Sequence, residues 1–184
     1  MFRGFISFDI QPSTRMKDLC VSLVECEAAL KVVSTDILHI TLKFLGDVSD
    51  MIVPDISKVM EESVRGIPPL KVDVSDVGAF PSKSNIRVVW IGISEPGDLK
   101  EIVKRLEDGL EPLGFKKEVR PFSPHLTVAR SKGSKGMGCV RELIQKWDGA
   151  DFGTQLLDRI RLKKSVLGPR GPTYTTLEEV PLRD

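Results

Sequence analysis

A four-residue pattern that occurs twice restricts the fold of this chain more than any other feature of its sequence. The segments His39-Ile-Thr-Leu42 and His125-Leu-Thr-Val128 each hold a histidine and a threonine two residues apart, with apolar residues after each. These two are the only histidines among the 184 residues. Because residues i and i+2 of a β-strand point to the same face, each pattern predicts a strand with one polar face and one core face.

The two patterns lie in segments of similar layout, because each predicted strand that carries a histidine lies between two helices. Hydrophobic periodicity predicts strands over 2–10, 37–45, 70–80, 87–93, 122–130, 158–167 and 174–180. It predicts one helix from an N-cap at Ser13 to about residue 30, and others over 53–65, 98–113 and 139–147. We therefore expect an α+β fold made of two pseudo-symmetric lobes, each an antiparallel-rich sheet flanked by helices, within one domain over 1–184.

Composition argues against several other classes of protein. Hydrophobic residues make up 41% and charged residues 29%, as in soluble globular domains. No apolar stretch is long enough for a membrane helix, and the first residues lack the cleavage site of a signal peptide. The three cysteines, Cys20, Cys26 and Cys139, form no CxxC pair, so we expect neither a disulfide framework nor a zinc ribbon, and a cytoplasmic location.

Charge is balanced overall but unevenly distributed along the chain. The formal net charge is +1, yet the last third of the sequence contains basic clusters at 116–120, 130–132 and 159–164. A solvated surface is the ordinary explanation of such clusters, and the alternative is a local face that binds an anion or a nucleic acid.

The residue types of the repeated pattern suit chemistry at a phosphate. Imidazole titrates near neutral pH and can donate or accept a proton, while a threonine hydroxyl donates a hydrogen bond to an anionic oxygen. Two such strands side by side would supply a base, an acid and two phosphate-binding hydroxyls. The alternatives are two structural histidines in a core, or a zinc site completed by an acidic residue such as Asp36 or Asp47, although catalytic zinc usually has three protein ligands.

The sequence also resembles the two-histidine (2H) phosphoesterase superfamily, and within it the prokaryotic RNA 2',3'-cyclic phosphodiesterases, which are also called 2'-5' RNA ligase-like proteins. The resemblance extends over nearly the whole chain. It rests on the segments Arg3–Asp9, His39–Gly46, Gly78–Pro81 with Arg87–Trp90, Arg120–Arg130, and Ser165 to Leu182.

This resemblance implies a bilobal fold with the two patterns facing each other across a central cleft. It also implies hydrolysis of an RNA 2',3'-cyclic phosphate end to a 2'-phosphate without a metal ion, ATP or another cofactor, with 2'-5' ligation as the possible reverse reaction. His39 would be the proton donor, His125 the proton acceptor, and Thr41 and Thr127 would bind the phosphate. The symmetry of the two patterns by itself allows the opposite assignment of acid and base.

Neighbouring residues extend this candidate site. Arg130 matches an arginine usual in the family, so we expect it to bind phosphate, although strict alternation points it away from His125. Lys43 shares the face of His39 by alternation, as a cleft cation or a solvated lysine. Tyr174 follows a glycine- and proline-rich loop and is a candidate for substrate binding.

Other aromatic residues are expected to have structural roles. We assign Phe44 and Trp90 to the core rather than to stacking on a base. The function hypotheses are an enzyme that acts on RNA ends and a non-catalytic module that binds RNA ends or nucleotides. Both require no membrane, and a monomer is sufficient for either.

Overall fold

The computed structural model describes residues 1–94, 96–169 and 171–183. The strands are β1 (Phe2–Asp9), β2 (Leu30–Val32), β3 (His39–Val48), β4 (Leu70–Pro81), β5 (Ile86–Ile93), β6 (His125–Ser131), β7 (Asp151–Leu157), β8 (Arg159–Gly168) and β9 (Gly171–Pro181). The α-helices are α1 (Thr14–Glu25), α2 (Val53–Val64), α3 (Gly97–Leu110) and α4 (Met137–Lys146). Short 3-10 turns cover Thr35–Ile37, Asp50–Ile52 and Glu111–Leu113.

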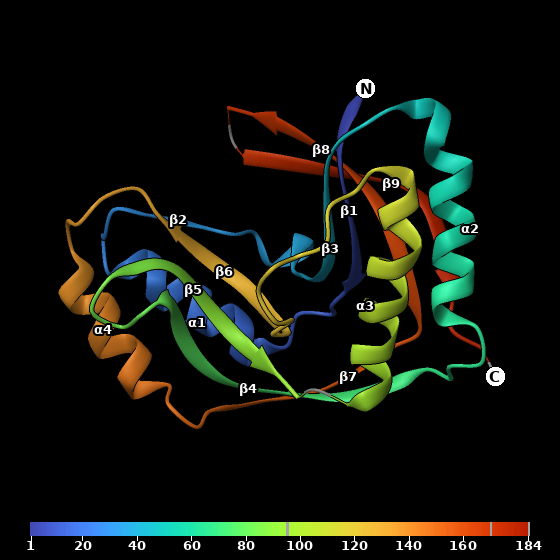
Figure 1. The fold of residues 1–184 in the computed structure, drawn as a ribbon. Coiled ribbons are helices and arrows are strands. Elements are labelled where there is room, and N and C mark those ends of the chain that lie inside the picture. Colours follow the sequence, from blue (N-terminus) through green and yellow to red (C-terminus); the bar gives the residue numbers. More distant parts are fainter. Residues whose placement is uncertain (95, 170, 184) are drawn as a thin grey trace.

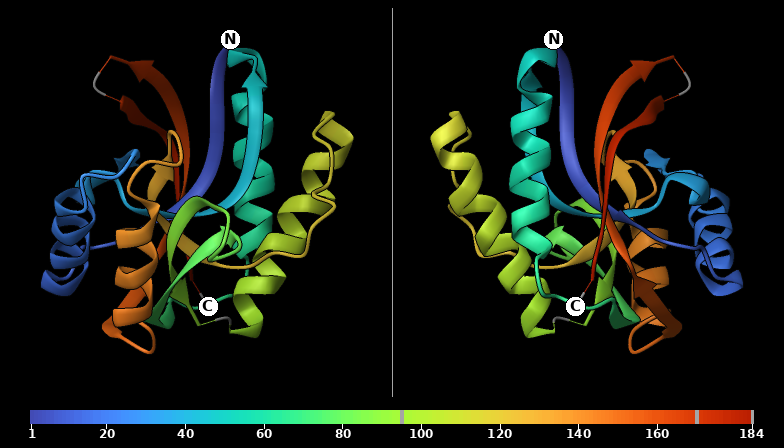
Figure 2. Two further views of the ribbon diagram at one scale, coloured as in Figure 1. Left: turned by 90° about the vertical axis from the view of Figure 1, so that its left-hand side faces the viewer. Right: turned by 90° about the vertical axis from the view of Figure 1, so that its right-hand side faces the viewer.

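A curled antiparallel sheet runs through the whole molecule (Figures 1 and 2). Its strand order is β7-β4-β5-β6-β3-β1-β8-β9, and β2 pairs with β6 as well. The central strands β3 and β6 pair at Ile40 and Leu126. We call β3, β1, β8 and β9 the β3 half-sheet, and β6, β5, β4, β7 and β2 the β6 half-sheet. The predicted α+β class is confirmed, and the two expected sheets are continuous through this central pair.

The helices form two pairs on opposite sides of the molecule, with the strands between them (Figure 2). Helices α2 and α3 pack together and contact β9 and β3, while α1 and α4 contact β6 and β4. Helix α1 therefore follows β1 of the β3 half-sheet but covers the β6 half-sheet, and α3 follows β5 but covers β3. This exchange of helices interlocks the halves. None of the described helices has the length and apolar character needed to cross a membrane.

The predicted helix starts and apolar stripes are largely confirmed. The Ser13 hydroxyl accepts a hydrogen bond from the Met16 amide at 3.3 Å, as an N-cap does. The predicted stripe of α3 is buried in full, at Ile102, Val103, Leu106 and Leu110. That of α1 is buried except at Val24, which was expected on the stripe but is 63% exposed. Helix α1, however, ends at Glu25 rather than near residue 30, because Glu27 adopts a positive φ of 46° and the chain then enters β2.

Two strands, β2 and β7, were not predicted from the sequence. Strand β2 has three residues, too few to show a period. Strand β7 is an edge strand whose residues are mostly exposed, so it lacks the alternation of apolar and polar residues that the prediction requires.

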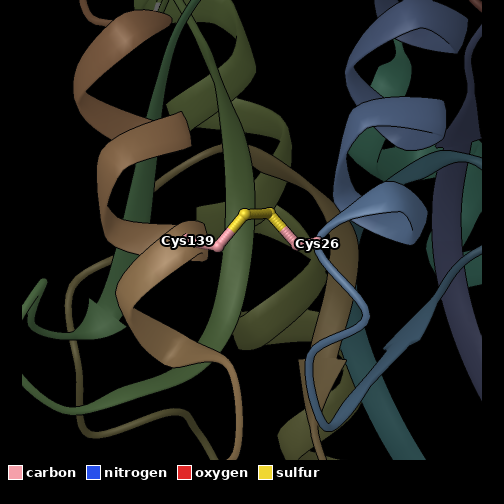
Figure 3. Close-up of a disulfide and its surroundings, with 2 residues drawn as sticks. All are labelled: Cys26 and Cys139. Atoms are coloured by element: carbon pink, nitrogen blue, oxygen red, sulfur yellow. A yellow bond between two sulfur atoms is a disulfide. The ribbon is translucent and has the colours of Figure 1, made fainter.

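The expectation of no disulfide is wrong. Cys26, after α1, is bonded to Cys139, near the start of α4, with the Cα atoms 5.7 Å apart (Figure 3). The two cysteines are 113 positions apart in the sequence, so only the packing of α1 beside α4 brings them together. Cys20 stays free and buried, and burial raises the pKa of its thiol to about 11.

Candidate active site

Each repeated pattern begins a central strand, since His39 is the first residue of β3 and His125 is the first residue of β6. The side chains alternate as predicted. The histidines and threonines are half-buried on one face, and the apolar residues that follow them are buried on the other: Ile40, Leu42, Leu126 and Val128. The strands therefore anchor in the core on one side and present their polar residues on the other.

The pairing of β3 with β6 brings the two patterns together. The strands are antiparallel, with Ile40 opposite Leu126. One residue to either side, the same register sets His39 across from Thr127 and Thr41 across from His125. Each histidine thus lies diagonally from the other, with a threonine beside it. This is the two-fold arrangement that the repeated pattern suggested.

Both imidazoles are anchored in the same way. Nδ1 of His39 lies 2.8 Å from the carbonyl oxygen of Ile37, and Nδ1 of His125 lies 2.7 Å from that of Ser123. A carbonyl oxygen can only accept, so each Nδ1 carries the proton and donates it. The Nε2 of each neutral ring is then the atom left to exchange a proton with a substrate. Burial lowers the pKa of both histidines, which favours the neutral form.

The threonine hydroxyls remain free for a ligand. Over the described ranges, the structure records no hydrogen bond from the side chain of Thr41 or Thr127 to another protein group. Both side chains are half-buried on the histidine face. A half-buried hydroxyl without a protein partner can donate to an oxygen of a bound phosphate.

A β-bulge in each strand turns a further residue to the histidine face. Along β1, Ser7 pairs with Thr41 and Ile6 with Lys43, so the ladder skips Leu42. Along β5, Trp90 pairs with Thr127 and Val89 with Ala129, so the ladder skips Val128. An extra residue reverses the alternation beyond it. The bulges therefore bring Phe44 and Arg130, each five positions after its histidine, to the side of the histidines.

The charge of Arg130 acts on both histidines. Burial lowers the pKa of His39 and of His125, and the Arg130 guanidinium lowers both further. Burial raises the pKa of Tyr174, which the same guanidinium opposes. Strict alternation would have pointed Arg130 away from the site, and the bulge at Val128 provides the reversal that this residue requires.

Lys43 lies outside the site, so the expectation that it faces His39 is wrong. The bulge turns it to the helix side, where it is 2% exposed. Its ammonium donates to both carboxylate oxygens of Glu107 in α3, at 2.9 and 2.8 Å, and to the carbonyl oxygen of Lys116 at 2.6 Å. It is neither a cleft cation nor a solvated lysine, and it joins β3 to α3.

The structure confirms neither of the two core aromatic assignments, since Trp90 also pairs with Thr127 on the histidine face and does not belong to the main hydrophobic core. Phe44 is 59% exposed on the histidine face, so its assignment to the core is wrong. Trp90 is half-buried and packs against Phe80, with ring centroids 5.3 Å apart. The indole also covers Gly78, where a Cβ would lie only 2.1 Å from the Trp90 ring, so this glycine permits the close approach.

Tyr174 of β9 reaches the first histidine, as its candidate role requires. Its ring meets His39 edge-on, with centroids 5.3 Å apart, and also contacts Phe5 at 4.9 Å. Phe5 in turn packs against His39 at 4.9 Å. These two aromatic rings hold the first imidazole in place.

A group of charged residues beside His39 was not predicted from the sequence. Asp9, at the end of β1, pairs with Lys163 and with Arg161 of β8, the latter at 3.2 Å. Burial lowers the pKa of His39, and its hydrogen bond to the Ile37 carbonyl raises it. The positive charge of Lys163 lowers the same pKa further, whereas the negative charge of Asp9 raises it. The basic cluster 159–164 was a possible anion-binding face by sequence, but ion pairs with carboxylates of the neighbouring strands neutralise much of its charge.

The alternative of a metal site gains no support from the arrangement of donor residues. In the part of the chain that the structure describes, no three His, Cys, Asp or Glu residues lie together as a potential ligand set. Asp36 and Asp47 accordingly form no such set with either histidine.

Comparisons with known proteins identify relatives over almost the whole chain. Residues 9–165 match the 2'-5' RNA ligase superfamily. The chain is 33% identical over 178 residues to the RNA 2',3'-cyclic phosphodiesterase of Methanothermobacter thermautotrophicus, covering 96% of each sequence. It is 38% identical over 150 residues to the protein of that name in Methanocaldococcus jannaschii, covering 82% of this chain and 83% of that one.

A solved structure agrees with these sequence matches. The protein TT0787 of Thermus thermophilus superposes with a TM-score of 0.76 at 26% identity, covering 98% of each chain.

Proposed function

This chain belongs to the 2'-5' RNA ligase superfamily, and from that premise we propose that it hydrolyses RNA 2',3'-cyclic phosphate ends to 2'-phosphates. The observation that carries the proposal is the pair of identically anchored imidazoles on adjoining strands, each with its Nε2 directed away from a backbone hydrogen bond. The relatives named above, called RNA 2',3'-cyclic phosphodiesterases, support the choice of reaction.

In the proposed reaction, the Nε2 of neutral His125 removes a proton from water, whose oxygen attacks phosphorus. The bond from phosphorus to the 3' oxygen breaks, and the Nε2–H of protonated His39 delivers a proton to that oxygen. One proton enters the site on His39 and one leaves on His125, so the charges balance. The resemblance supports this assignment of donor and acceptor, and microscopic reversibility exchanges the two roles in the direction of 2'-5' ligation.

The remaining residues of the site bind the phosphate in this proposal. The hydroxyls of Thr41 and Thr127 donate to its non-bridging oxygens from opposite sides, and Arg130 provides a charged donor. Phe44 provides an exposed ring on the same face, on which the terminal base can stack. Tyr174 orients His39 from its edge.

The hydrogen bond that anchors His39 also affects its protonation, which the proposed proton donor requires. The Nδ1–H bond to the Ile37 carbonyl stabilises protonated His39, whereas burial and the cations Lys163 and Arg130 oppose protonation. A bound anionic phosphate favours the protonated form. We therefore propose that substrate binding itself brings His39 to its acid form.

The proposed partner is RNA, and the proposed location is the cytoplasm, with the protein acting as a monomer without metal or nucleotide cofactor. The disulfide does not oppose this location, because disulfides occur inside the cells of hyperthermophilic archaea and bacteria.

The test uses an RNA with a 2',3'-cyclic phosphate end, incubated with the protein in EDTA and without ATP. We expect a 2'-phosphate product, mapped by its resistance to enzymes that remove only 3'-phosphates. Binding without turnover would identify the alternative, a non-catalytic module for RNA ends. Turnover that EDTA abolishes would contradict the metal-free reaction, and joined RNA ends with 2'-5' links would indicate that ligation competes.

A further inference from the structure

A cavity of about 510 Å³ lies where β5 begins and β6 ends, beside the segment that leads into α4. It is separate from the histidine face, because it lies at the ends of the inner strands β5 and β6 and against the start of α4. The residues that give it its chemistry are Asn85, Arg87, Ser131, Ser134 and Arg141. Its size is in the usual range for ligand pockets, which hold a small molecule or part of a larger one.

The cavity is cationic and its charge is not compensated. It contains Arg87 from β5 and Arg141 from α4, and no acidic residue lines it. Over residues 1–94, 96–169 and 171–183, neither arginine forms a recorded ion pair or hydrogen bond. Some arginines elsewhere on the surface are paired, as Arg65 is with Glu62 and Arg105 with Glu101. The Ser131 hydroxyl already donates to the Gly133 carbonyl at 2.9 Å, which leaves the two free guanidinium groups and the Ser134 hydroxyl. Guanidinium groups suit a phosphate, which they can bind in bidentate fashion.

The strand pairing connects this cavity to the candidate active site. Ser131, in the cavity wall, directly follows Arg130, and Arg87 precedes Val88, which pairs with Arg130. Both side chains therefore leave their strands on the face opposite to Arg130, and an RNA chain from the histidine face reaches the cavity by passing round the strand ends. Ser131 is four residues beyond Thr127, which corresponds to about 13 Å along a strand. At a rise of about 3.4 Å or more per nucleotide, an RNA strand covers that distance within about four nucleotides.

Another cation lies beside Arg130, across β6 from the strand that carries Arg87. Lys31 of β2 pairs with Arg130 across the ladder, so both side chains are on one face of the sheet. Its ammonium lies beside Gly171, at the start of β9, where an added Cβ would be 3.2 Å from it. The described residues give Lys31 no carboxylate partner. Unpaired positive charge therefore extends from Arg130 across the histidine face toward β9, and the cavity adds a second group of unpaired charge at the ends of the strands.

We propose that this cavity binds the phosphate backbone of the RNA body, about four or more nucleotides 5' of the cyclic phosphate. The inference rests on the proposed function, because it extends the substrate of that same site from a terminal nucleotide to an RNA chain. The enzyme then selects RNA ends over nucleoside 2',3'-cyclic phosphates. Because phosphate contacts carry no base information, this preference is independent of sequence in the RNA body.

The test compares two substrates, a short RNA oligonucleotide with a 2',3'-cyclic phosphate end and a nucleoside 2',3'-cyclic phosphate. For the double variant Arg87→Ala/Arg141→Ala, we expect kcat/KM on the oligonucleotide to fall about tenfold or more, as for the loss of charge-assisted hydrogen bonds. Turnover of the nucleoside substrate stays unchanged. The salt dependence of log KM for the oligonucleotide weakens by about 0.7 in slope for each phosphate that the variant no longer binds.

Matched variants separate this role from general effects of charge or folding. Arg65→Ala, which removes an exposed arginine at the C-terminal end of α2, leaves both substrates unaffected. Ser134→Asp keeps both arginines but adds a carboxylate to the cavity wall, and it reproduces the selective loss on the oligonucleotide. Circular dichroism of each variant verifies that it is folded.

A binding measurement keeps the inference separate from the proposed reaction. Fluorescence anisotropy with a labelled oligonucleotide that already ends in a 2'-phosphate requires no turnover, and the double variant should bind it about tenfold or more weakly. If the wild-type protein binds this RNA through the cavity but hydrolyses nothing, the proposed function fails and the inference stands. Unchanged oligonucleotide affinity in the double variant, or an equal loss on both substrates, overturns the inference.

Discussion

The two histidine strands have the same backbone design but different surroundings. In each, the imidazole Nδ1 donates to the carbonyl two residues earlier, and a bulge three residues after the histidine reverses the alternation. The residues turned to the face are Phe44 in β3 and Arg130 in β6, an aromatic ring and a cation. The duplicated part of the design therefore positions functional groups, and the part that differs between the strands decides what each group does.

The surroundings of the imidazoles also differ. His39 is packed by Phe5 and Tyr174 and lies near the Asp9–Lys163 pair, whereas His125 meets Phe80 edge-on at 5.0 Å. A charged network beside one imidazole and an aromatic wall beside the other give two similar groups different protonation behaviour. In the proposed reaction, this asymmetry is what distinguishes the histidine that acts as acid from the one that acts as base.

The strongest test of this comparison removes each histidine. We expect His39→Ala and His125→Ala each to lower kcat by about two to four decades, the usual contribution of a general acid or base. A substrate with sulfur in place of the 3' oxygen distinguishes them, because a sulfur leaving group needs no protonation. It should restore much of the rate of His39→Ala and none of that of His125→Ala. Restoration of His125→Ala instead would reverse the two roles.

The two halves of the molecule also differ in the bonds that hold their covering helices in place. The disulfide joins α1 to α4 over the β6 half-sheet, while no disulfide joins α2 to α3 in the described residues. Loop-closure entropy for a link of about 100 residues predicts up to about 4.7 kcal/mol, and measured values are usually about 2–4 kcal/mol. We therefore expect Cys26→Ser/Cys139→Ser to lower the free energy of unfolding by about 3 kcal/mol.

Chemical denaturation with and without a reductant measures this contribution. Reduction should destabilise the wild-type protein and leave the double variant unchanged. A wild-type protein whose unfolding midpoint is the same in both conditions would show that the disulfide adds no stability.

On the other half, the Lys43–Glu107 pair fastens β3 to α3. The corresponding residue of β6 is Ala129, which is fully buried, so an apolar side chain serves the same position there. Lys43→Ala leaves Glu107 without its partner, and we expect a loss of about 3 kcal/mol of stability. Lys43→Met, with a similar length, combined with Glu107→Leu should recover most of that loss, as apolar replacements of buried ion pairs often do. The same unfolding measurement applies, and a Lys43→Ala variant of wild-type stability would contradict the role.

The sequence predicted which residues of the two patterns share a face, but it did not predict the disulfide or the Lys43–Glu107 ion pair. His39, Thr41, His125 and Thr127 were predictable because a period of two residues needs only local information. The faces of Lys43 and Phe44 were not, because a bulge is determined by pairing with another strand, and the sequence of β3 alone does not reveal it. The disulfide and the Asp9–Lys163 pair likewise join residues that only the tertiary fold brings together.

The two bulge positions provide a direct comparison of effects on activity. Arg130→Ala removes a charged donor to phosphate, and we expect kcat/KM to fall about ten- to a hundredfold, from about 1.5–3 kcal/mol per such bond. Phe44→Ala removes a stacking surface, and we expect a loss of about five- to tenfold, near the low end of about 1–3 kcal/mol per stacked base. Steady-state kinetics on one cyclic phosphate substrate compares them. A larger loss of kcat/KM for Phe44→Ala than for Arg130→Ala would contradict these roles for the two residues.

The smallest expected effect concerns stability and pH. Burial lowers the folded-state pKa of both histidines, so between the folded and unfolded pKa values the unfolded chain binds more protons. Stability is therefore complete above the unfolded value, near pH 6.5, and decreases as pH falls through the folded values. The chain has only these two histidines, and few other side chains titrate between about pH 5.5 and 7.

Unfolding free energies measured across that interval should consequently decline toward acid in the wild-type protein. His39→Gln and His125→Gln should each remove part of the decline, and the double variant should remove most of it. The charged network distinguishes the two contributions, because Asp9→Asn takes away a carboxylate that raises the pKa of His39. That variant should steepen the decline when His39 is present and have no effect on its slope when His39 is glutamine. An equal effect of Asp9→Asn in both backgrounds would mean that the network does not act on the first histidine, and the two strands would then differ in packing alone.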